Sequence, residues 1–560
     1  MFIYESMKIF CRGEWGNCGR GKYGLASFYS FPPPAAARCC RLFLSAILMP
    51  RKNLRQPAAH SLKGKPCKSR QIPGQSVVCV CNVTYCDELV RVAPAQGKYV
   101  TYTTSEAGSR FVRVTRDLRN KDYYESNVLE LVLNPRQKYQ KVEGFGGAVT
   151  DAASINWLNL TDSRLKKSLI DTYFSKLGLE YNMLRVPIGG CDFSTHPYAY
   201  NEFPADDVSL SNFSLAYEDY QYKIPMIKEI MKAAVAPVHI VSSTWSPPLW
   251  MKNKPVWGGK NKLKPEYYQT YADYHIKFLE AYQANGIPIW GITTTNEPND
   301  GFLGLAPFNT LGWSPLNQPI WISENLGPTV RNSSFFDLKI LALDDQRASI
   351  PWLLAMLYIS PEMVEYIDGV AVHFYADKII PPEFLSFMSD KYPDKFLLST
   401  EACEGSFGPI KVLLGSWNRA KSYITDIMQD LNYNVVGWID WNLCLNVQGG
   451  PNWVENFVDS PIIVFPENKE FVKQPMFYAL GHFSKFLPRG SQRIKVNQRT
   501  PPRSSPVDNV AFLTPRNTVV VVLYNDGGPK RVIIQIGQKK AIVPMEARSV
   551  VTVEMALKQN

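Results

Sequence analysis

Eight short apolar runs recur along the chain, with stretches of helical periodicity between them. The runs are residues 141–147, 181–190, 237–248, 287–298, 338–346, 368–375, 395–403 and 434–442. Each is too short for a typical helix and fits a strand that is buried on both faces. Helical periodicity marks intervening stretches such as 216–234 and 265–286. This alternation predicts an α/β fold, a (β/α)8 TIM barrel, with functional residues at the carboxyl ends of the strands.

A chain of 560 residues is longer than such a barrel requires. From about residue 490 the pattern becomes alternating and β-rich, with turn signals such as Asn525 to Gly528 and no helical period. We expect an accessory β-sandwich from 91–136 and 490–560, and a small N-terminal β segment at 67–90 that packs with 443–475. The barrel would then comprise 137–442 and 476–489.

Cysteines indicate the compartment. Cys67, Cys79, Cys81 and Cys86 cluster beside the sequon at Asn82. Spacings of 12, 2 and 5 without a histidine fit a zinc site poorly, so two disulfides and a secretory route are the better interpretation. Further sequons predict glycosylation at Asn159, Asn212 and Asn332, and free thiols are expected at Cys191, Cys403 and Cys444.

The first sixty residues differ from the rest in charge. They hold nine Lys and Arg against two Asp and Glu, and therefore contribute +7 of the formal net charge of +11. We interpret 1–60 as a basic segment that is disordered or serves in targeting, with a short apolar stretch at 42–49, or as an artefact of translation or of the gene model. The remaining +4 argues against nucleic-acid binding, and no apolar run is long enough to cross a membrane.

Two glutamates follow predicted strands. Glu297 lies in TTTNEP after the fourth strand, and Glu401 lies in LLSTEAC at the end of the seventh. Most carboxylates are solvated surface groups, but these two are not on a polar helix face, and paired carboxyls at strand ends can cleave a glycosidic bond. Cys403 is a weaker candidate nucleophile, because no histidine nearby in the sequence would activate it.

An ordered set of motifs resembles the acid β-glucosidases, or glucosylceramidases, of glycoside hydrolase family thirty. The motifs are FGGAVTDAAS, RVPIGGCDFS, TWSPPLWMK, TTTNEP, LDDQR, STEACEGS, VVGWIDWN and GGPNWVENFVDSPIIV. The match runs from about Cys67 to the C-terminus. It implies a retaining β-glucosidase that acts on glucosylceramide without a metal or cofactor. It also implies a lysosomal, peripherally membrane-associated enzyme that works with a saposin-type activator and an anionic lipid surface and reaches the lysosome through a receptor.

The resemblance also assigns roles. Glu297 would be the acid/base and Glu401 the nucleophile, while Arg185 and Tyr375 would stabilise the charge on Glu401 and His373 would support the catalytic groups. The pairs Cys67–Cys79 and Cys81–Cys86 would be disulfides. The residues expected to contact the glucose are Asp151, Trp245, Asn296, Trp441 and Asn456.

An apolar loop follows Glu297 at 301–308, and we expect Phe308 and Trp313 to form a lip for the ceramide. Asp344, Asp345 and Arg347 are interpreted as a structural charge network near the barrel rim. The chain departs from the family pattern at Phe374 and Thr310, and at 465–473 in a region linked to receptor delivery. The alternatives are a related glycosidase for β-xylosidic or β-glucuronic linkages, a non-catalytic glycolipid-binding protein, and a receptor-bound structural protein.

Overall fold

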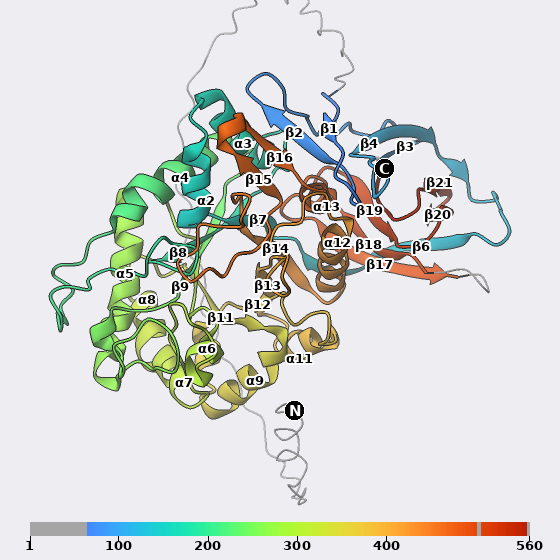
Figure 1. The fold of residues 1–560 in the computed structure, drawn as a ribbon. Helices are drawn as coiled ribbons and strands as arrows, with labels where there is room; N and C mark the ends of the chain where they lie inside the picture. The colour runs from blue at the N-terminus through green and yellow to red at the C-terminus, as the bar shows by residue number, and fades with distance from the viewer. Residues whose placement is uncertain (1–63, 501–505, 557–560) are drawn as a thin grey trace, which may run out of the picture. The chain divides into compact units, whose positions relative to one another are not determined.

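The computed structural model describes residues 64–500 and 506–556, so the basic segment 1–60 lies outside the described residues. Eight parallel strands close into a barrel, each neighbour paired to the next and β14 paired to β7 (Figure 1). The strands are β7 (Gly144–Ala148), β8 (Met183–Ile188), β9 (His239–Thr244), β10 (Gly291–Thr293), β11 (Lys339–Gln346), β12 (Gly369–His373), β13 (Phe396–Glu401) and β14 (Val435–Asn442). Each overlaps one predicted run, and the predicted TIM barrel is confirmed.

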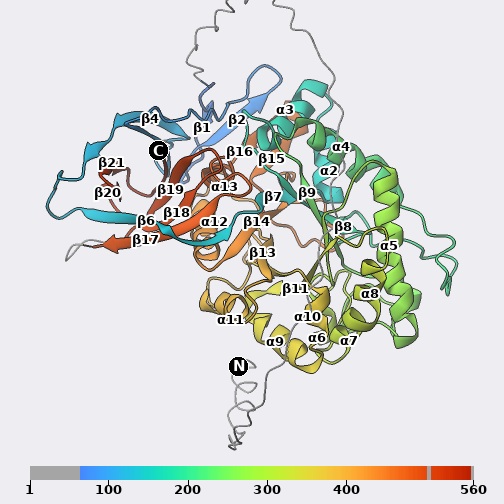
Figure 2. The same cartoon turned by 180° about the vertical axis from the view of Figure 1, so that it is seen from behind.

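Helices surround these strands, as the view from behind also shows (Figure 2). N-cap residues mark where some of these helices begin. The Thr150 hydroxyl accepts from the Ala153 amide at the first turn of α2, and the Ser416 hydroxyl accepts from the Arg419 amide at the start of α12. The helices are α2 (Asp151–Asn159), α3 (Ser163–Phe174), α4 (Ile224–Ala233), α5 (Tyr268–Ala284), α6 (Pro298–Leu303), α7 (Asn317–Trp321), α8 (Gly327–Arg331), α9 (Ile350–Ile359), α10 (Met363–Tyr366), α11 (Glu383–Lys391), α12 (Trp417–Asn432) and α13 (Pro475–Ser484).

The β-sandwich joins the two ends of the described chain. Within the described residues its ten strands form one hydrogen-bonded order, β4-β3-β22-β19-β18-β17-β6-β20-β21-β5. Their bounds are β3 (Lys98–Ser105), β4 (Val112–Asp117), β5 (Arg119–Asn120), β6 (Leu129–Lys141), β17 (Gln492–Arg499), β18 (Asp508–Leu513), β19 (Thr518–Asn525), β20 (Lys530–Ile536), β21 (Lys539–Met545) and β22 (Ser549–Ala556). The strands of 98–141 therefore complete a sheet whose other strands follow the barrel.

A separate four-stranded sheet carries both disulfides. Its order is β1-β2-β16-β15, from Ser69–Arg70, Val78–Asn82, Glu470–Lys473 and Ile462–Phe465. Cys67 is bonded to Cys79 and Cys81 to Cys86, whereas the buried Cys191, Cys403 and Cys444 are free, as predicted. The disulfides are local to residues 67–86, and it is the pairing of β2 with β16 that joins the N-terminal strands to a distant part of the chain.

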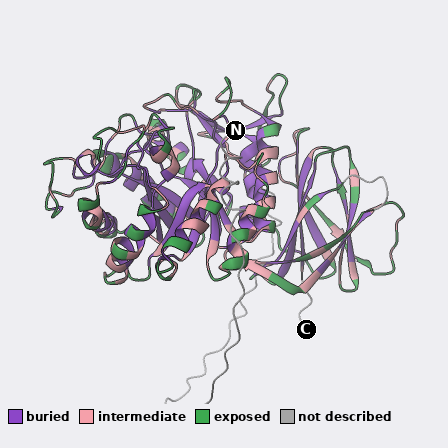
Figure 3. Ribbon diagram, turned by 90° about the horizontal axis from the view of Figure 1, so that it is seen from below, coloured by how far each residue is buried: buried purple, intermediate pink, exposed green. Residues whose placement is uncertain are grey.

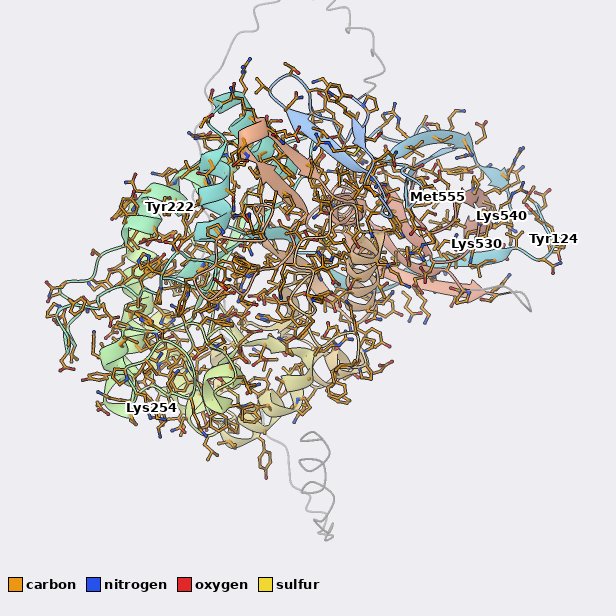
Figure 4. The ribbon with its side chains drawn as sticks, in the orientation of Figure 1. Tyr124, Tyr222, Lys254, Lys530, Lys540 and Met555 are labelled. Atoms are coloured by element: carbon orange, nitrogen blue, oxygen red, sulfur yellow. A yellow bond between two sulfur atoms is a disulfide. The ribbon has the colours of Figure 1, made fainter. Side chains whose placement is uncertain are left out.

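Burial follows the layers. The barrel strands and the facing surfaces of the sandwich are buried, while the outer faces of the surrounding helices are exposed (Figure 3). Some loop side chains are open to solvent, for example Tyr124 between β5 and β6, which is 82% exposed (Figure 4). The sequons also reach solvent: Asn159, Asn212 and Asn332 are exposed and Asn82 is half-buried. A search of the described helices for a span that could cross a membrane finds none.

Candidate active site

The backbone at the end of β10 directs Glu297 into the barrel mouth. Glu297 has a left-handed conformation, with φ of 40°, at the start of α6. This conformation is uncommon for a residue with a Cβ and is typical of strained functional positions. It is held by a hydrogen bond from the Glu297 amide to the carbonyl of Asp344, at 2.9 Å. The neighbouring Asn296 donates its amide to the carbonyl of Thr244 at the end of β9.

Glu401 ends β13 with both carboxylate oxygens occupied. One oxygen accepts from the Arg185 guanidinium and the other from the Tyr375 hydroxyl at 2.6 Å. Arg185 is fully buried, and a second guanidinium nitrogen donates to Asn296 and to Asp344, both at 2.7 Å. Burial opposes the charge on Arg185, but Asp344 and Glu401 outweigh it and raise the pKa of Arg185. Glu401 therefore has a buried cation against one oxygen and a hydroxyl donor against the other.

Asp344 is the centre of this network. A β-bulge in β11 interrupts the register between Leu343 and Asp345, and both Leu343 and Asp344 have positive φ. The bulge sends the Asp344 side chain into the barrel, where it is completely buried. Besides Arg185, it accepts from four neighbours: Ser243, Thr293 and Thr400 at 2.7 Å each, and His373 at 3.1 Å. Burial favours the protonated form, but the Arg185 charge and these donors hold the pKa of Asp344 well below its usual range.

His373 connects Asp344 to Glu297. Its Nε2 faces Asp344 and its Nδ1 faces Glu297 Oε1 at 3.0 Å. Burial opposes the charged ring, yet Glu401, Asp344 and Glu297 raise the pKa of His373 to about 10, so the imidazolium donates to both carboxyls. Gln346 Nε2 donates to the same Glu297 oxygen at 2.9 Å.

Glu401 is paired with a guanidinium, whereas Glu297 is buried near other carboxyls. Burial raises the pKa of Glu297 to about 8, and the negative charges of Asp300 and Glu401 add to this effect against the hydrogen bond from His373. One oxygen of Glu297 lies within 4.8 Å of one oxygen of Glu401. The site thus holds, side by side, a carboxyl whose pKa is raised and a carboxyl that is paired with a buried guanidinium.

These two carboxyls open onto a cavity of about 670 Å³. Glu297, Glu401, Trp245, Trp441 and Asn296 line it, as do Tyr375, Asn456 and Phe308. Trp245 and Trp441 stack at 5.3 Å between ring centroids, and both rings contact the Arg185 guanidinium. Asn456 donates to Asp192 at 3.1 Å. His373 does not line the cavity, which agrees with a supporting role.

The expectation for Asp151 needs correction. Asp151 begins α2 and does not line the cavity; its carboxylate accepts from Ser194 and Tyr198 and lies 4.0 Å from Lys223. The carboxyl that does reach the cavity is Asp192, in the loop after β8. Burial raises the pKa of Asp192 to about 7, and the Glu401 charge adds to the effect. Its position in RVPIGGCDFS, directly after a predicted strand, is the sequence signal that could have identified it.

The expectation for Trp313 is also wrong. Its ring is 2% exposed, stacks on Trp321 and donates to Thr295, so it belongs to the barrel core. Phe308 does line the cavity, together with Leu303 and Leu305 of the predicted loop 301–308, and the apolar rim continues through Ile379 and Phe407, which the sequence did not single out. Apart from Phe308, these side chains are between 55% and 81% exposed.

The predicted rim network divides into separate parts. Asp344 is central to the site, Asp345 lines the cavity, and Arg347 points away to the carbonyl of Ile380 and the carboxylate of Asp377. Cys403 reaches the cavity, but burial raises the pKa of its thiol well above the usual value, so it is not an activated nucleophile. Glu297, His373 and Glu401 are close enough to hold a metal, but hydrogen-bond donors already occupy both Glu401 oxygens.

Comparisons with known proteins agree with this geometry. Residues 142–487 match the glycosyl hydrolase family 30 TIM-barrel domain, and residues 490–553 match the β-sandwich domain of the same family. The chain is 43% identical to the lysosomal acid glucosylceramidase of Mus musculus over 478 residues, covering 84% of this chain and 91% of that protein. An endo-1,6-β-D-glucanase of Trichoderma harzianum is 27% identical over 70% of this chain and 78% of its own.

The fold is also that of solved structures. The crystal structure of SrfJ from Salmonella typhimurium superposes with a TM-score of 0.75 at 24% identity, over 82% of this chain and 100% of that one.

We predict that Asp344→Asn destabilises the protein by about 3–5 kcal/mol, because Arg185 and His373 would lose their shared buried counter-charge. Chemical denaturation followed by tryptophan fluorescence measures the change. Asp273→Asn on α5 is the matched control, since Asp273 only accepts from the exposed Gln269. Equal stability of both variants would contradict the central role of Asp344.

Proposed function

The chain belongs to glycosyl hydrolase family 30, and from this premise we propose that it is a retaining β-glucosidase that hydrolyses glucosylceramide to glucose and ceramide. The observation that carries the proposal is the close spacing of Glu297 and Glu401, of which only Glu401 is paired with the buried Arg185. Oxygens of the two carboxyls lie within 4.8 Å, which fits direct attack by one carboxylate and leaves no room for the intervening water of an inverting enzyme.

In the first step, Glu401 attacks the anomeric carbon while Glu297 protonates the departing ceramide oxygen. The ion pair with Arg185 and the hydrogen bond from Tyr375 stabilise the negative charge on Glu401 before attack. The attack forms a covalent glucosyl-enzyme and leaves Glu297 as a carboxylate beside the imidazolium of His373. In the second step, Glu297 takes a proton from water, and the water oxygen displaces Glu401. Both carboxyls then regain their starting states.

Sugar recognition falls to the polar groups around the stacked tryptophans. Asp192 and Asn456 are hydrogen-bonded to each other and line the cavity, where they can bind glucose hydroxyls. Asn296 stands next to Glu297 and can bind the 2-hydroxyl, a contact that strengthens in the transition state. Trp245 and Trp441 supply the apolar surface against which the sugar ring packs. No step requires a metal or an organic cofactor.

The exposed apolar rim supports a lipid aglycone. The mouth of the cavity is lined by Leu303, Leu305, Phe308, Ile379 and Phe407. Exposed apolar side chains at this place fit an apolar aglycone, whereas a substrate made only of sugar would not need them. The same rim would contact an anionic lipid surface or a saposin-type activator. The lysosomal relative supports a place in the lysosome lumen, reached by the secretory pathway and a delivery receptor, with glycans on the exposed sequons.

The mechanism is tested by stereochemistry with a fluorogenic β-glucoside. We expect proton NMR to show β-glucose as the first product of the parent enzyme. Glu401→Gly should lose turnover and give an α-glucosyl azide when azide is added, because azide attacks from the face that the carboxylate has vacated. Glu297→Ala should be slower by roughly 10²–10⁴-fold and give a β-glucosyl azide. The retaining mechanism would be refuted if the parent released α-glucose first, or if both variants gave the same anomer of glucosyl azide.

The lipid aglycone is tested on the rim. Leu305→Asp should lower turnover of glucosylceramide in anionic vesicles, with and without a saposin-type activator, and leave the fluorogenic glucoside nearly unaffected, because Leu305 is 67% exposed at the cavity mouth. Leu177→Asp, an exposed leucine outside the cavity lining, is the matched control. An equal loss on both substrates would count against a lipid-binding rim. Turnover of a β-xyloside or β-glucuronide, but not of the glucoside, would favour the related specificities.

The pH profile tests the protonation of Glu297. Because the negative charge of Asp300 raises the pKa of Glu297, Asp300→Asn should lower that pKa by roughly one unit. The acid is active when protonated, so the alkaline limb of kcat/KM should move to lower pH by the same amount. Asp171→Asn on α3 serves as the control. An unchanged alkaline limb in Asp300→Asn would show that another group sets it.

A further inference from the structure

A second cluster of buried carboxyls lies outside the barrel mouth. Asp426 and Asp430 stand one turn apart on α12, and Asp377 lies in the turn after β12. One carboxylate oxygen from each lies within 4.8 Å of the other two. Asp426 and Asp430 are 4% and 1% exposed, and the Asp377 side chain is 5% exposed. The proposed reaction uses none of these groups.

The cluster contains carboxylate oxygens without donors. Asp426 uses one oxygen to accept from Trp438 at 2.9 Å, and its other oxygen has no donor apart from a proton shared with the Asp377 carboxyl. Neither oxygen of Asp430 accepts a well-formed hydrogen bond, although the Ser399 hydroxyl is near enough to lower the pKa of Asp430. Buried carboxylate oxygens nearly always have a partner, because an unpaired one loses its hydration without replacement.

The charges of the cluster are also unbalanced. Three carboxylates face Arg347, whose Nε lies 3.1 Å from Asp377. Lys378 is the other cation that influences Asp426, but it is 64% exposed and paired with Glu404 at 2.8 Å. Burial, and after it the charges of Asp426 and Asp430, raises the pKa of Asp377, so a bound proton is the alternative to a cation at this cluster. If all three carboxyls are ionised, one arginine leaves two negative charges without a counter-charge.

We propose that Asp377, Asp426 and Asp430 form a binding site for a divalent cation, with Ca²⁺ as the preferred ion. An all-oxygen ligand set suits this hard cation, and ligands at 2.3–2.6 Å on opposite sides of Ca²⁺ stand about 5 Å apart. The observed oxygen spacing fits within that limit. Asp430 can bind through both free oxygens and Asp426 through one. Two positive charges would bring the three carboxylates and Arg347 to neutrality.

The site would connect α12 to the segment that supports catalysis. Asp377 stands two residues after Tyr375, which donates to Glu401. Arg347 follows Gln346, which donates to Glu297, and Arg347 also donates to the carbonyl of Asp377 at 2.5 Å. A bound ion would fix the turn after β12 against α12. We therefore expect the ion to stabilise the fold around the barrel mouth and to take no part in the chemical step.

The purified full chain, freed of metal with EDTA and dialysed, provides the test at pH 7. Calorimetric titration with CaCl₂ should show one saturable site, and the melting temperature should rise with CaCl₂ more than with MgCl₂. Asp430→Asn and Asp426→Asn should each weaken Ca²⁺ binding roughly tenfold or more, because each removes a charged ligand. Both should remain folded without metal, because each also removes an unpaired charge. Asp273→Asn on α5 should bind Ca²⁺ as the parent does.

Measurements on the parent protein alone test whether it binds Ca²⁺. If the parent gives no calorimetric Ca²⁺ signal and no shift in melting temperature at pH 7, the proposal is overturned. The cluster would then be neutralised by protons bound to its carboxyls. Ca²⁺ binding that survives unchanged in both Asp430→Asn and Asp426→Asn would overturn it as well, because the ion would then occupy some other place. Loss of binding in these two variants, with binding retained in Asp273→Asn, supports it.

Discussion

The charge of one buried guanidinium organises the active site. Arg185 lies on β8 without access to solvent, and a buried cation of this kind persists only when anions and acceptors surround it. Asp344 on β11 and Glu401 on β13 supply the negative charge, and Asn296 supplies a neutral acceptor beside β10. Strands that are distant in sequence are therefore joined through one side chain, and the contacts that offset the charge of Arg185 also place a cation against Glu401.

The protonation of Glu297 follows from this balance. Arg185 and the imidazolium of His373 already match the negative charges of Asp344 and Glu401. Ionising Glu297 would add a negative charge that nothing in the network offsets, close to Glu401 and in a buried place. Two glutamates at strand ends thus lie in different electrostatic surroundings, because only Glu401 contacts Arg185. The raised pKa of Glu297, on which the proposed reaction depends, is a property of the whole network and not of that residue alone.

The alternation of apolar runs with helical periods was sufficient to predict the barrel. Each strand is buried on both faces and is therefore a continuous apolar run, and the chain repeats such a run eight times. The glutamates could be recognised because each directly follows such a strand. Side-chain direction was harder to predict. Asp151 and Asp192 both follow strands, but only Asp192 faces the cavity. Asp344 was expected at the rim, yet a one-residue bulge in β11 turns it inward, and sequence spacing contains no sign of a bulge. Trp313 was assigned to the lip, but its place is in the core.

Two adjacent residues join the active-site network to the acidic cluster behind it. Gln346 donates to Glu297, and Arg347 turns the other way to balance part of the charge of Asp377, Asp426 and Asp430. The first network is neutral through the protein's own cations, whereas the second has a single arginine for three carboxylates. Because buried charge must be offset by a side chain, a proton or an ion, the second cluster needs something that the described side chains do not provide. Whatever fills that need also constrains the segment that positions Glu297 and Tyr375.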